Sequence, residues 1–258
     1  MWGTIKSYLA AIRHTQISLG LGDPEMGGMT RLEYVVKGCK RKATNASKRT
    51  RLPITPVILG RLRVEWQKKS DTKDATMLWA AATMCFFGFL RAGEVVTGSD
   101  STFDPAIHLA HGDVLIDNQY PPQFLEVRIK ASKTDPFRKG VSVYLGRSGT
   151  DLCPVSAVLA YMVERGRAPG PFFRYSNGTY LTRERFVRDT RSALTKAGLD
   201  CTQFAGHSYR IGAVTTAARQ GVQDSLIKTL GRWESSAYTM YIRTPKETLC
   251  SVARSLVK

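Results

Sequence analysis

The sequence predicts a mostly α-helical protein that carries one small antiparallel β-sheet. Apolar residues recur at helical spacing over most of the 258-residue chain. Two segments, 124–131 and 141–146, instead alternate apolar and polar residues, and the polar segment 132–140 between them predicts a β-hairpin. Residues 75–90 are apolar on nearly every side, which predicts a helix buried in the core.

The first 52 residues predict a small helical piece followed by a basic linker. We expect a helix over residues 4–16, a glycine-rich turn over 20–28 and a short second helix over 29–38. Residues 37–51 contain seven basic residues and no acidic one, which is typical of a flexible linker or of a DNA-backbone contact. The basic residues expected to contact DNA are Lys37, Lys40, Arg41, Lys42, Lys48, Arg49 and Arg51.

The main domain is predicted to extend from residue 53 to residue 258. Its first helix covers 55–68, where Pro56 suits the first turn, and the buried helix ends at Arg91. Helices dominate again after the hairpin, over residues 154–165, 183–197, 208–220, 223–230, a short 236–242 and 246–257.

Composition favours a nucleic-acid partner. The chain has 38 Lys and Arg against 21 Asp and Glu, a formal charge of +17, so its field attracts polyanions. Its five cysteines form no C-x-x-C pair, which argues against a disulfide framework or a zinc ribbon. The N-terminus lacks a signal-peptide pattern, and no apolar run is long enough to span a membrane. We therefore expect a cytosolic or nuclear protein.

Several catalytic motifs are incomplete in this sequence. His108 and His111 have helical spacing but no third metal ligand nearby, and residues 206–210 have Arg210 where a serine-hydrolase elbow closes with glycine. The glycines at 140 and 146 lack the lysine and the spacing of an ATP-binding loop, and no paired acidic cluster suggests a two-metal nuclease. No metal or cofactor is predicted.

A set of cations and donors remains, spread over the chain. Metal-free phosphodiester cleavage needs groups that stabilise a negatively charged transition state, activate a nucleophile and protonate a leaving oxygen. Arg91 and Arg210 can each bind two phosphate oxygens through a planar guanidinium, and His207 lies one helical turn before Arg210. Trp233 adds an uncharged N–H donor, while Tyr238 and Tyr241 follow shortly after it.

Together these residues resemble the catalytic signature of the tyrosine recombinases. The resemblance rests on FLRAGE around Arg91, the hairpin lysine Lys133, H-S-Y-R at 207–210, LGRW at 230–233 and AYTMYIR at 237–243. The wording is most similar to recombinases of eukaryotic DIRS-like and Crypton-like mobile elements. It covers residue 53 to the end, and it implies the catalytic-domain fold of that family. The preceding segment resembles the latter half of the family's helical core-binding domain, so the chain is expected to begin inside that domain.

The resemblance implies a role for each matching residue. Tyr241 would attack the scissile phosphate and form a 3'-phosphotyrosine, without metal, ATP or cofactor. Arg91, Arg210 and His207 would hold the non-bridging oxygens, with His207 also accepting the tyrosine proton, and Trp233 would donate to the same phosphate.

Two assignments leave alternatives open. Lys133 would protonate the departing 5'-oxygen, although Lys130 and Lys139 lie in the same hairpin. Tyr238 lies three residues before Tyr241 and competes for the nucleophile's role. Glu94 is expected to orient the arginine one turn before it through a charge-assisted hydrogen bond.

The implied partner is double-stranded DNA, on which the family forms tetramers. Residues 246–258 carry an apolar stripe that either docks on its own core or inserts into a neighbouring subunit, as the family suggests. The implied location is nuclear, or cytosolic in a prokaryote. Two other functions remain open: a decayed recombinase that binds DNA without cleaving it, and a type IB topoisomerase that relaxes supercoils as a monomer.

Overall fold

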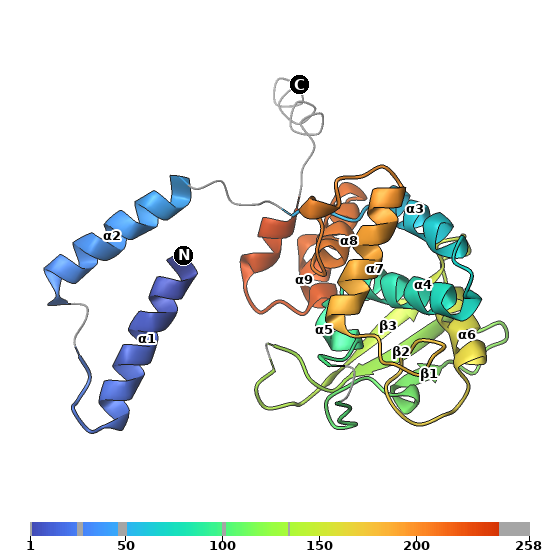
Figure 1. The fold of residues 1–258 in the computed structure, drawn as a ribbon, viewed down its shortest axis with the longest axis horizontal. Coiled ribbons are helices and arrows are strands. Elements are labelled where there is room, and N and C mark those ends of the chain that lie inside the picture. Colours follow the sequence, from blue (N-terminus) through green and yellow to red (C-terminus); the bar gives the residue numbers. More distant parts are fainter. Residues whose placement is uncertain (1, 25–27, 46–50, 100–101, 134, 243–258) are drawn as a thin grey trace, which may run out of the picture. The chain divides into compact units, whose positions relative to one another are not determined.

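The computed structural model describes residues 2–24, 28–45, 51–99, 102–133 and 135–242. It divides into two compact units, Met1–Thr50 and Arg51–Lys258, each of which is described by itself (Figure 1). The expected helix over residues 246–257 lies outside the described residues. No helix of the described part is long and apolar enough to cross a membrane.

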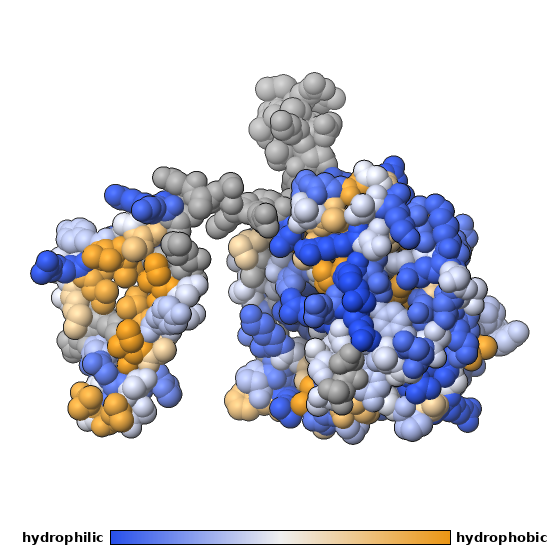
Figure 2. All heavy atoms as spheres, viewed as in Figure 1, coloured by the Kyte–Doolittle hydropathy of each residue, from blue (hydrophilic) through white to orange (hydrophobic). Residues whose placement is uncertain are grey.

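The first unit is a pair of helices, α1 (Trp2–Ser18) and α2 (Thr30–Asn45). The prediction of a flexible linker beginning at residue 37 is wrong in its first part, because α2 continues to Asn45 and includes the first four cations. Consecutive Lys and Arg residues are good helix formers, so a basic run does not by itself end a helix. Figure 2 shows apolar side chains gathered on this unit, where Ile12, Leu19 and Val35 are all exposed.

The second unit is organised around a buried helix, as the sequence predicts. Helix α3 (Pro56–Gln67) begins at Thr55, whose hydroxyl accepts a hydrogen bond from the backbone of Ile58, with proline in the first turn. Helix α4 (Thr72–Phe87) is buried on all sides over residues 77–86 and packs against α3, α6 (Pro154–Arg165) and α8 (Ser208–Arg219). The short helix α5 (Ala92–Val95) follows it.

The sheet has three antiparallel strands rather than the two expected. Strand β2 (Phe124–Ile129) pairs with β3 (Val141–Gly146) in the predicted hairpin, and β1 (Val114–Ile116) adds to the other edge of β2. A segment of three residues is too short to show a period of two, which explains why β1 was missed. The strands lie beside α6 (Figure 1), and their inward side chains complete the core.

The remaining helices bring the C-terminal motifs onto the core. They are α7 (Arg183–Lys196), α8, α9 (Asp224–Gly231) and a 3₁₀ helix, η4 (Ser236–Tyr241). Helix α8 passes so close to the start of the unit that a Cβ at Gly212 would lie 1.9 Å from the Ile54 carbonyl oxygen. This contact fixes α8, which begins with the H-S-Y-R motif, against the chain segment that precedes α3.

Candidate active site

Arg91 lies at the junction between α4 and α5 and is held by one carboxylate. Glu94 accepts hydrogen bonds from the Arg91 backbone N–H and from its guanidinium Nη1, both at 2.8 Å. The arginine side chain is 19% exposed, whereas that of Glu94 is only 4% exposed. A carboxylate at the third position of a helix can cap that helix and pair with the residue before it, so the E of FLRAGE both begins α5 and orients Arg91.

A pocket of about 390 Å³ opens beside this pair, and its lining includes three cations and a histidine. Arg91 and Glu94 form one wall, Lys133 of the hairpin turn another, and His207 and Arg183 complete it. Arg183 is the first residue of α7 and was missed by sequence reasoning, since it is one of several arginines in a polar helix. Four positive or ionisable groups against one carboxylate make the pocket suitable for a phosphate.

The surroundings of His207 favour its neutral form. The residue is exposed, but partial burial of its ring lowers its pKa, and the charges of Arg91, Arg183, Arg210 and Lys133 lower it further. A histidine with an ordinary pKa near 6.5 is already mostly neutral at pH 7, and this shift leaves less imidazolium. The neutral ring has a free lone pair that can accept a proton.

Arg210 is buried, which the sequence did not predict. Only 1% of its surface is exposed, and its Nη1 donates to the Phe89 carbonyl at 2.8 Å while Nη2 donates to the Gly231 carbonyl. Its guanidinium carbon lies 4.1 Å from the centroid of the Trp233 ring, in a cation–π contact. Burial, followed by the charge of Arg91, lowers its pKa to about 10, so it remains charged at neutral pH.

The Trp233 ring covers the Arg210 guanidinium, and the Tyr241 ring lies next to that of Trp233 at an angle of 37°. The Trp233 ring lies 5.8 Å from the Tyr241 ring, and the Thr215 hydroxyl of α8 donates to the Tyr241 carbonyl at 2.9 Å. A Cβ at Gly231 would lie 1.3 Å from the Trp233 ring, so only glycine permits this position of the indole. Arg210, Trp233 and Tyr241 lie outside the lining of the pocket, beside it rather than within it.

Hydrogen bonds to Glu94 join the segment that carries Trp233 and Tyr241 to the pocket. Arg232, the residue between Gly231 and Trp233, donates from Nη2 to Glu94 at 2.7 Å, so Glu94 pairs with two guanidinium groups. The charges of Arg91 and Glu94 both act on the pKa of Arg210. The structure therefore brings Arg91 and Arg232 together on one carboxylate, and Arg210 lies near enough for the charges of Arg91 and Glu94 to act on it. Arg232 was missed because nothing in the sequence relates it to a glutamate 138 positions earlier.

The three hairpin lysines have different surroundings. Lys130 pairs with the Asp113 carboxylate, and Lys139 lies with Arg138 beside a separate hollow at the base of the hairpin. Lys133 lines the cationic pocket, where its charge reaches His207. Of the three hairpin lysines, Lys133 is thus the one that lines the pocket.

The two tyrosines are also distinguished by their contacts. Tyr238 is 8% exposed and its hydroxyl donates to the Asp224 carboxylate at 3.2 Å, while its ring lies 6.0 Å from that of Trp233. Tyr241 is half-buried, its ring lies 5.8 Å from that of Trp233, and its backbone carbonyl accepts a hydrogen bond from Thr215. The hydroxyl of Tyr238 is thus engaged by a carboxylate of α9, whereas Tyr241 accepts its hydrogen bond through its backbone.

The basic residues expected to contact DNA fall into three groups. Lys37, Lys40, Arg41 and Lys42 lie on α2 of the first unit, and Lys48 and Arg49 lie outside the described residues. Arg51 belongs to the second unit, where its Nη1 donates to the Thr202 carbonyl at 2.7 Å.

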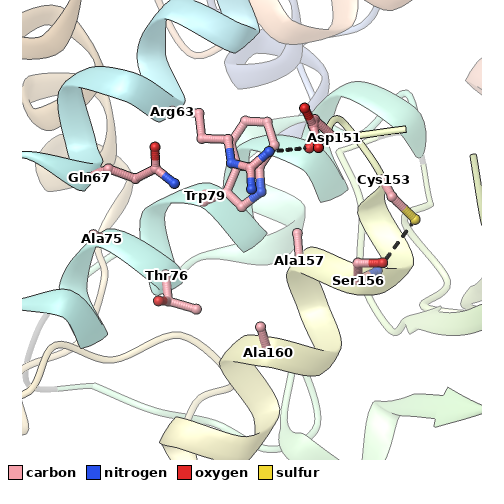
Figure 3. A pocket seen from close by; sticks show the side chains of 10 residues that line it. All are labelled: Arg63, Gln67, Ala75, Thr76, Trp79, Asp151, Cys153, Ser156, Ala157 and Ala160. Carbon is pink, nitrogen blue, oxygen red and sulfur yellow. Dashed lines mark hydrogen bonds between the residues drawn. The ribbon is translucent and has the colours of Figure 1, made fainter. Parts of the chain in front are cut away.

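A second hollow lies between α3, α4 and α6, away from these residues (Figure 3). Arg63 stacks over Trp79 at 5.3 Å and donates to the Asp151 carbonyl at 2.6 Å, so it ties α3 to the loop before α6. The Cys153 sulfur accepts a hydrogen bond from the Ser156 backbone and caps α6. Burial acts to raise the pKa of this thiol, but hydrogen bonds from Ser156 and Ser148 lower it to about 7. Because Cys153 is only 4% exposed, we interpret it as a helix cap.

Among the described residues, no group of three or more His, Cys, Asp or Glu side chains is placed to hold a metal ion. No family model matches the sequence, and no curated protein is similar to it at a significant level. Solved structures, in contrast, match over most of the chain.

Three structural matches are informative about the fold. The XerH site-specific recombinase, in a post-cleavage complex with its palindromic difH substrate, has a TM-score of 0.59 and 16% identity over 81% of this chain and 54% of its own. XerA recombinase has a TM-score of 0.57 and 16% identity over 80% of this chain and 64% of its own. A lambda integrase dimer bound to a COC' core site has a TM-score of 0.52 and 14% identity over 91% and 63%.

The second unit therefore has the fold of a tyrosine recombinase catalytic domain, as predicted. The chain spans 54% to 64% of the length of the three proteins compared.

Proposed function

We propose that this protein is a site-specific DNA recombinase or integrase that cleaves and rejoins DNA through a 3'-phosphotyrosine intermediate. The observation that carries the proposal is the placement of Arg91, His207 and Lys133 in the lining of one pocket, with Arg210 buried beneath the Trp233 ring and the Tyr241 ring tilted against that of Trp233. The fold and the DNA-bound state of similar structures support a DNA substrate.

The reaction is a transesterification in which one phosphate ester replaces another. The Tyr241 hydroxyl oxygen attacks the scissile phosphorus, the new bond joins that oxygen to the phosphorus, and the bond to the 5'-oxygen breaks. The tyrosine proton passes to neutral His207, and Lys133 gives a proton to the departing 5'-oxygen. One ester is exchanged for another, so neither ATP nor a redox partner is required.

The cations stabilise the transition state, where the phosphate carries additional negative charge. Arg91 presents a partly exposed guanidinium to the pocket, and Arg210 contributes its buried charge from below the Trp233 ring. A fixed charge in a site of low dielectric stabilises such a transition state more than the same charge in water would. Tyr241 must swing its hydroxyl into the pocket for attack, since its ring lies outside the lining.

We further propose that copies of this chain assemble on duplex DNA and form a tetramer in the complete reaction. Residues 246–258 would make the contacts between the copies. The amino-acid sequence of the motifs supports a source in a DIRS-like or Crypton-like mobile element and a nuclear location. Basic residues of α2 and the chain segment after it would add contacts to the DNA backbone.

Covalent trapping tests the proposal. Wild-type protein is incubated with a nicked duplex whose short product diffuses away, and a denaturation-resistant protein–DNA complex is measured over a library of candidate sites. We expect wild type to form the complex, Tyr241→Phe to form none, and the matched control Tyr238→Phe to retain it.

Each other outcome identifies a different error. If wild type shifts DNA but forms no complex on any site, the protein binds DNA without cleaving it. If Tyr241→Phe still forms the complex, the assigned nucleophile is wrong. If wild type relaxes supercoiled plasmid as a monomer and joins no second duplex, the topoisomerase assignment replaces recombination.

A further inference from the structure

Arg232 occupies an unusual place in the chain. It follows the last residue of α9 and begins the segment that carries Trp233 and Tyr241. Its φ of 56° lies in the left-handed region, which glycine adopts easily and which is strained for a residue with a side chain. A non-glycine residue held in this conformation indicates that its side chain makes contacts that offset the strain.

Those contacts are with Glu94. The Arg232 Nη2 atom lies 2.7 Å from Glu94 Oε2, and Arg91 Nη1 lies 2.8 Å from Glu94 Oε1. The carboxylate therefore bridges two guanidinium groups, one beside the pocket and one at the root of the tyrosine segment. The side chain of Arg232 is 16% exposed and that of Glu94 is 4% exposed, so solvent screens this bridge little.

The bridge leaves positive charge in excess. Burial lowers the pKa of Arg232, and the charge of Arg91 lowers it further, while Glu94 acts in the opposite direction. Within the described part of the chain, the buried Arg232 Nη1 has no hydrogen-bond partner. The guanidinium groups of Arg91 and Arg232 share one carboxylate, while Arg210 donates to two backbone carbonyls. An anion in the adjacent pocket would compensate this excess.

We propose that Arg232 is a positioning residue, which through Glu94 couples the segment bearing the nucleophile to the phosphate-binding Arg91. This inference rests on the proposed function. Its physical basis is that the Arg232–Glu94 pair is a direct side-chain link between the segment 232–241 and a residue that lines the pocket. Breaking the bridge leaves Glu94 paired with Arg91 alone and removes the link from that carboxylate to the tyrosine segment, so Arg91 and the segment no longer hold a common geometry around the phosphorus.

The variant Arg232→Gly removes the guanidinium while keeping the backbone. Glycine adopts a φ of 56° without strain, so any loss in this variant comes from the side chain rather than from a distorted turn. Arg232→Lys keeps the charge but loses the planar fork, and we expect it to restore part of the lost rate. The matched control is Arg219→Ala, which removes an exposed cation at the end of α8, away from Glu94.

Two measurements test the coupling. In single-turnover covalent trapping, Arg232→Gly should form the complex about 10 to 100 times more slowly, because a displacement of about 1 Å has effects of that size. Its affinity for DNA should change by less than about threefold, because a buried cation that pairs with a carboxylate does not neutralise a backbone phosphate. In hydrogen exchange without DNA, amides of residues 91–96 and 232–241 should exchange faster together in Arg232→Gly, and not in Arg219→Ala.

The outcomes separate the two proposals. If Arg232→Gly cleaves and exchanges as wild type does, the positioning role is overturned. A parallel loss of affinity and cleavage would also overturn it, because Arg232 would then be a direct phosphate ligand. If wild type itself forms no covalent complex, the proposed function fails, and unchanged exchange in Arg232→Gly would then refute the coupling on its own.

Discussion

Replacement of Arg210 by alanine should destabilise the fold as well as impair any reaction. In a site of exposed phosphate-binding arginines, each could be removed with little effect on stability. Arg210 is instead 1% exposed, donates to the carbonyls of Phe89 and Gly231, and stacks on Trp233 at 4.1 Å. It therefore joins the end of α4 to the end of α9, and its loss leaves two buried carbonyls without their donor.

The expected size follows from these contacts. A hydrogen bond from a charged donor contributes about 1.5–3 kcal/mol, and a desolvated cation–π contact contributes about 2 kcal/mol. Relief of the repulsion from Arg91 and of the burial of one charge offsets part of this. We expect Arg210→Ala to lower the free energy of unfolding by about 3 kcal/mol. Arg91→Ala, at a side chain with one partly exposed ion pair, should lower it by about 1 kcal/mol.

Chemical denaturation followed by circular dichroism measures both values at pH 7. For a unit of this size, a difference of about 2 kcal/mol corresponds to roughly 4–8 °C between the melting temperatures of the two variants. Arg210→Lys should resemble Arg210→Ala more than wild type, since lysine cannot reach both carbonyls and stack at once. Equal free energies of unfolding for Arg210→Ala and Arg91→Ala would refute the interpretation that Arg210 links the end of α4 to the end of α9.

Two further predictions concern proton transfer. Lys133→Ala should slow strand cleavage at least about 100-fold, and a substrate with sulfur in place of the bridging 5'-oxygen should restore the rate, because a thiolate leaves without protonation. Lys130→Ala and Lys139→Ala are the matched controls. If either control cleaves more slowly and the sulfur substrate restores its rate, that lysine, and not Lys133, is the proton donor. The pKa of His207 is lower in the folded state than in the unfolded state, where it is near 6.5. The stability that neutral His207 contributes is therefore fully present above pH 6.5 and is lost as the pH falls below that value. Wild type should therefore lose more stability than His207→Gln between pH 7 and pH 5 in urea titrations, and parallel curves would contradict the shift.

Local signals in the sequence identify most of the helices. Thr55 with Pro56 predicts the start of α3, and Pro154 predicts the start of α6, because a capping side chain and proline act within one turn. The burial of α4 is also predicted locally, because a helix that is apolar on nearly every side has no face suited to water. The extension of α2 to Asn45 and the strand β1 were not predicted, because neither a basic run nor a segment of three residues carries a periodic signal.

The site was predicted unevenly. The spacing of Arg91 and Glu94 predicts their hydrogen bond, since residues three apart meet at the start of a helix. Nothing comparable links Glu94 to Arg232, or Arg183 to His207, because both pairs meet only after distant segments pack.

The amino-acid sequence alone determined which chemical groups this protein carries and where its helices begin, because caps, prolines and apolar periodicity act over a few neighbouring residues. Tertiary structure alone decided how exposed each cation is and which partner it has. It buried Arg210 under Trp233, assigned Lys130 to Asp113, and made Glu94 the common partner of two arginines. Charge interactions depend on distance and on solvent screening, and both are properties of the packed chain.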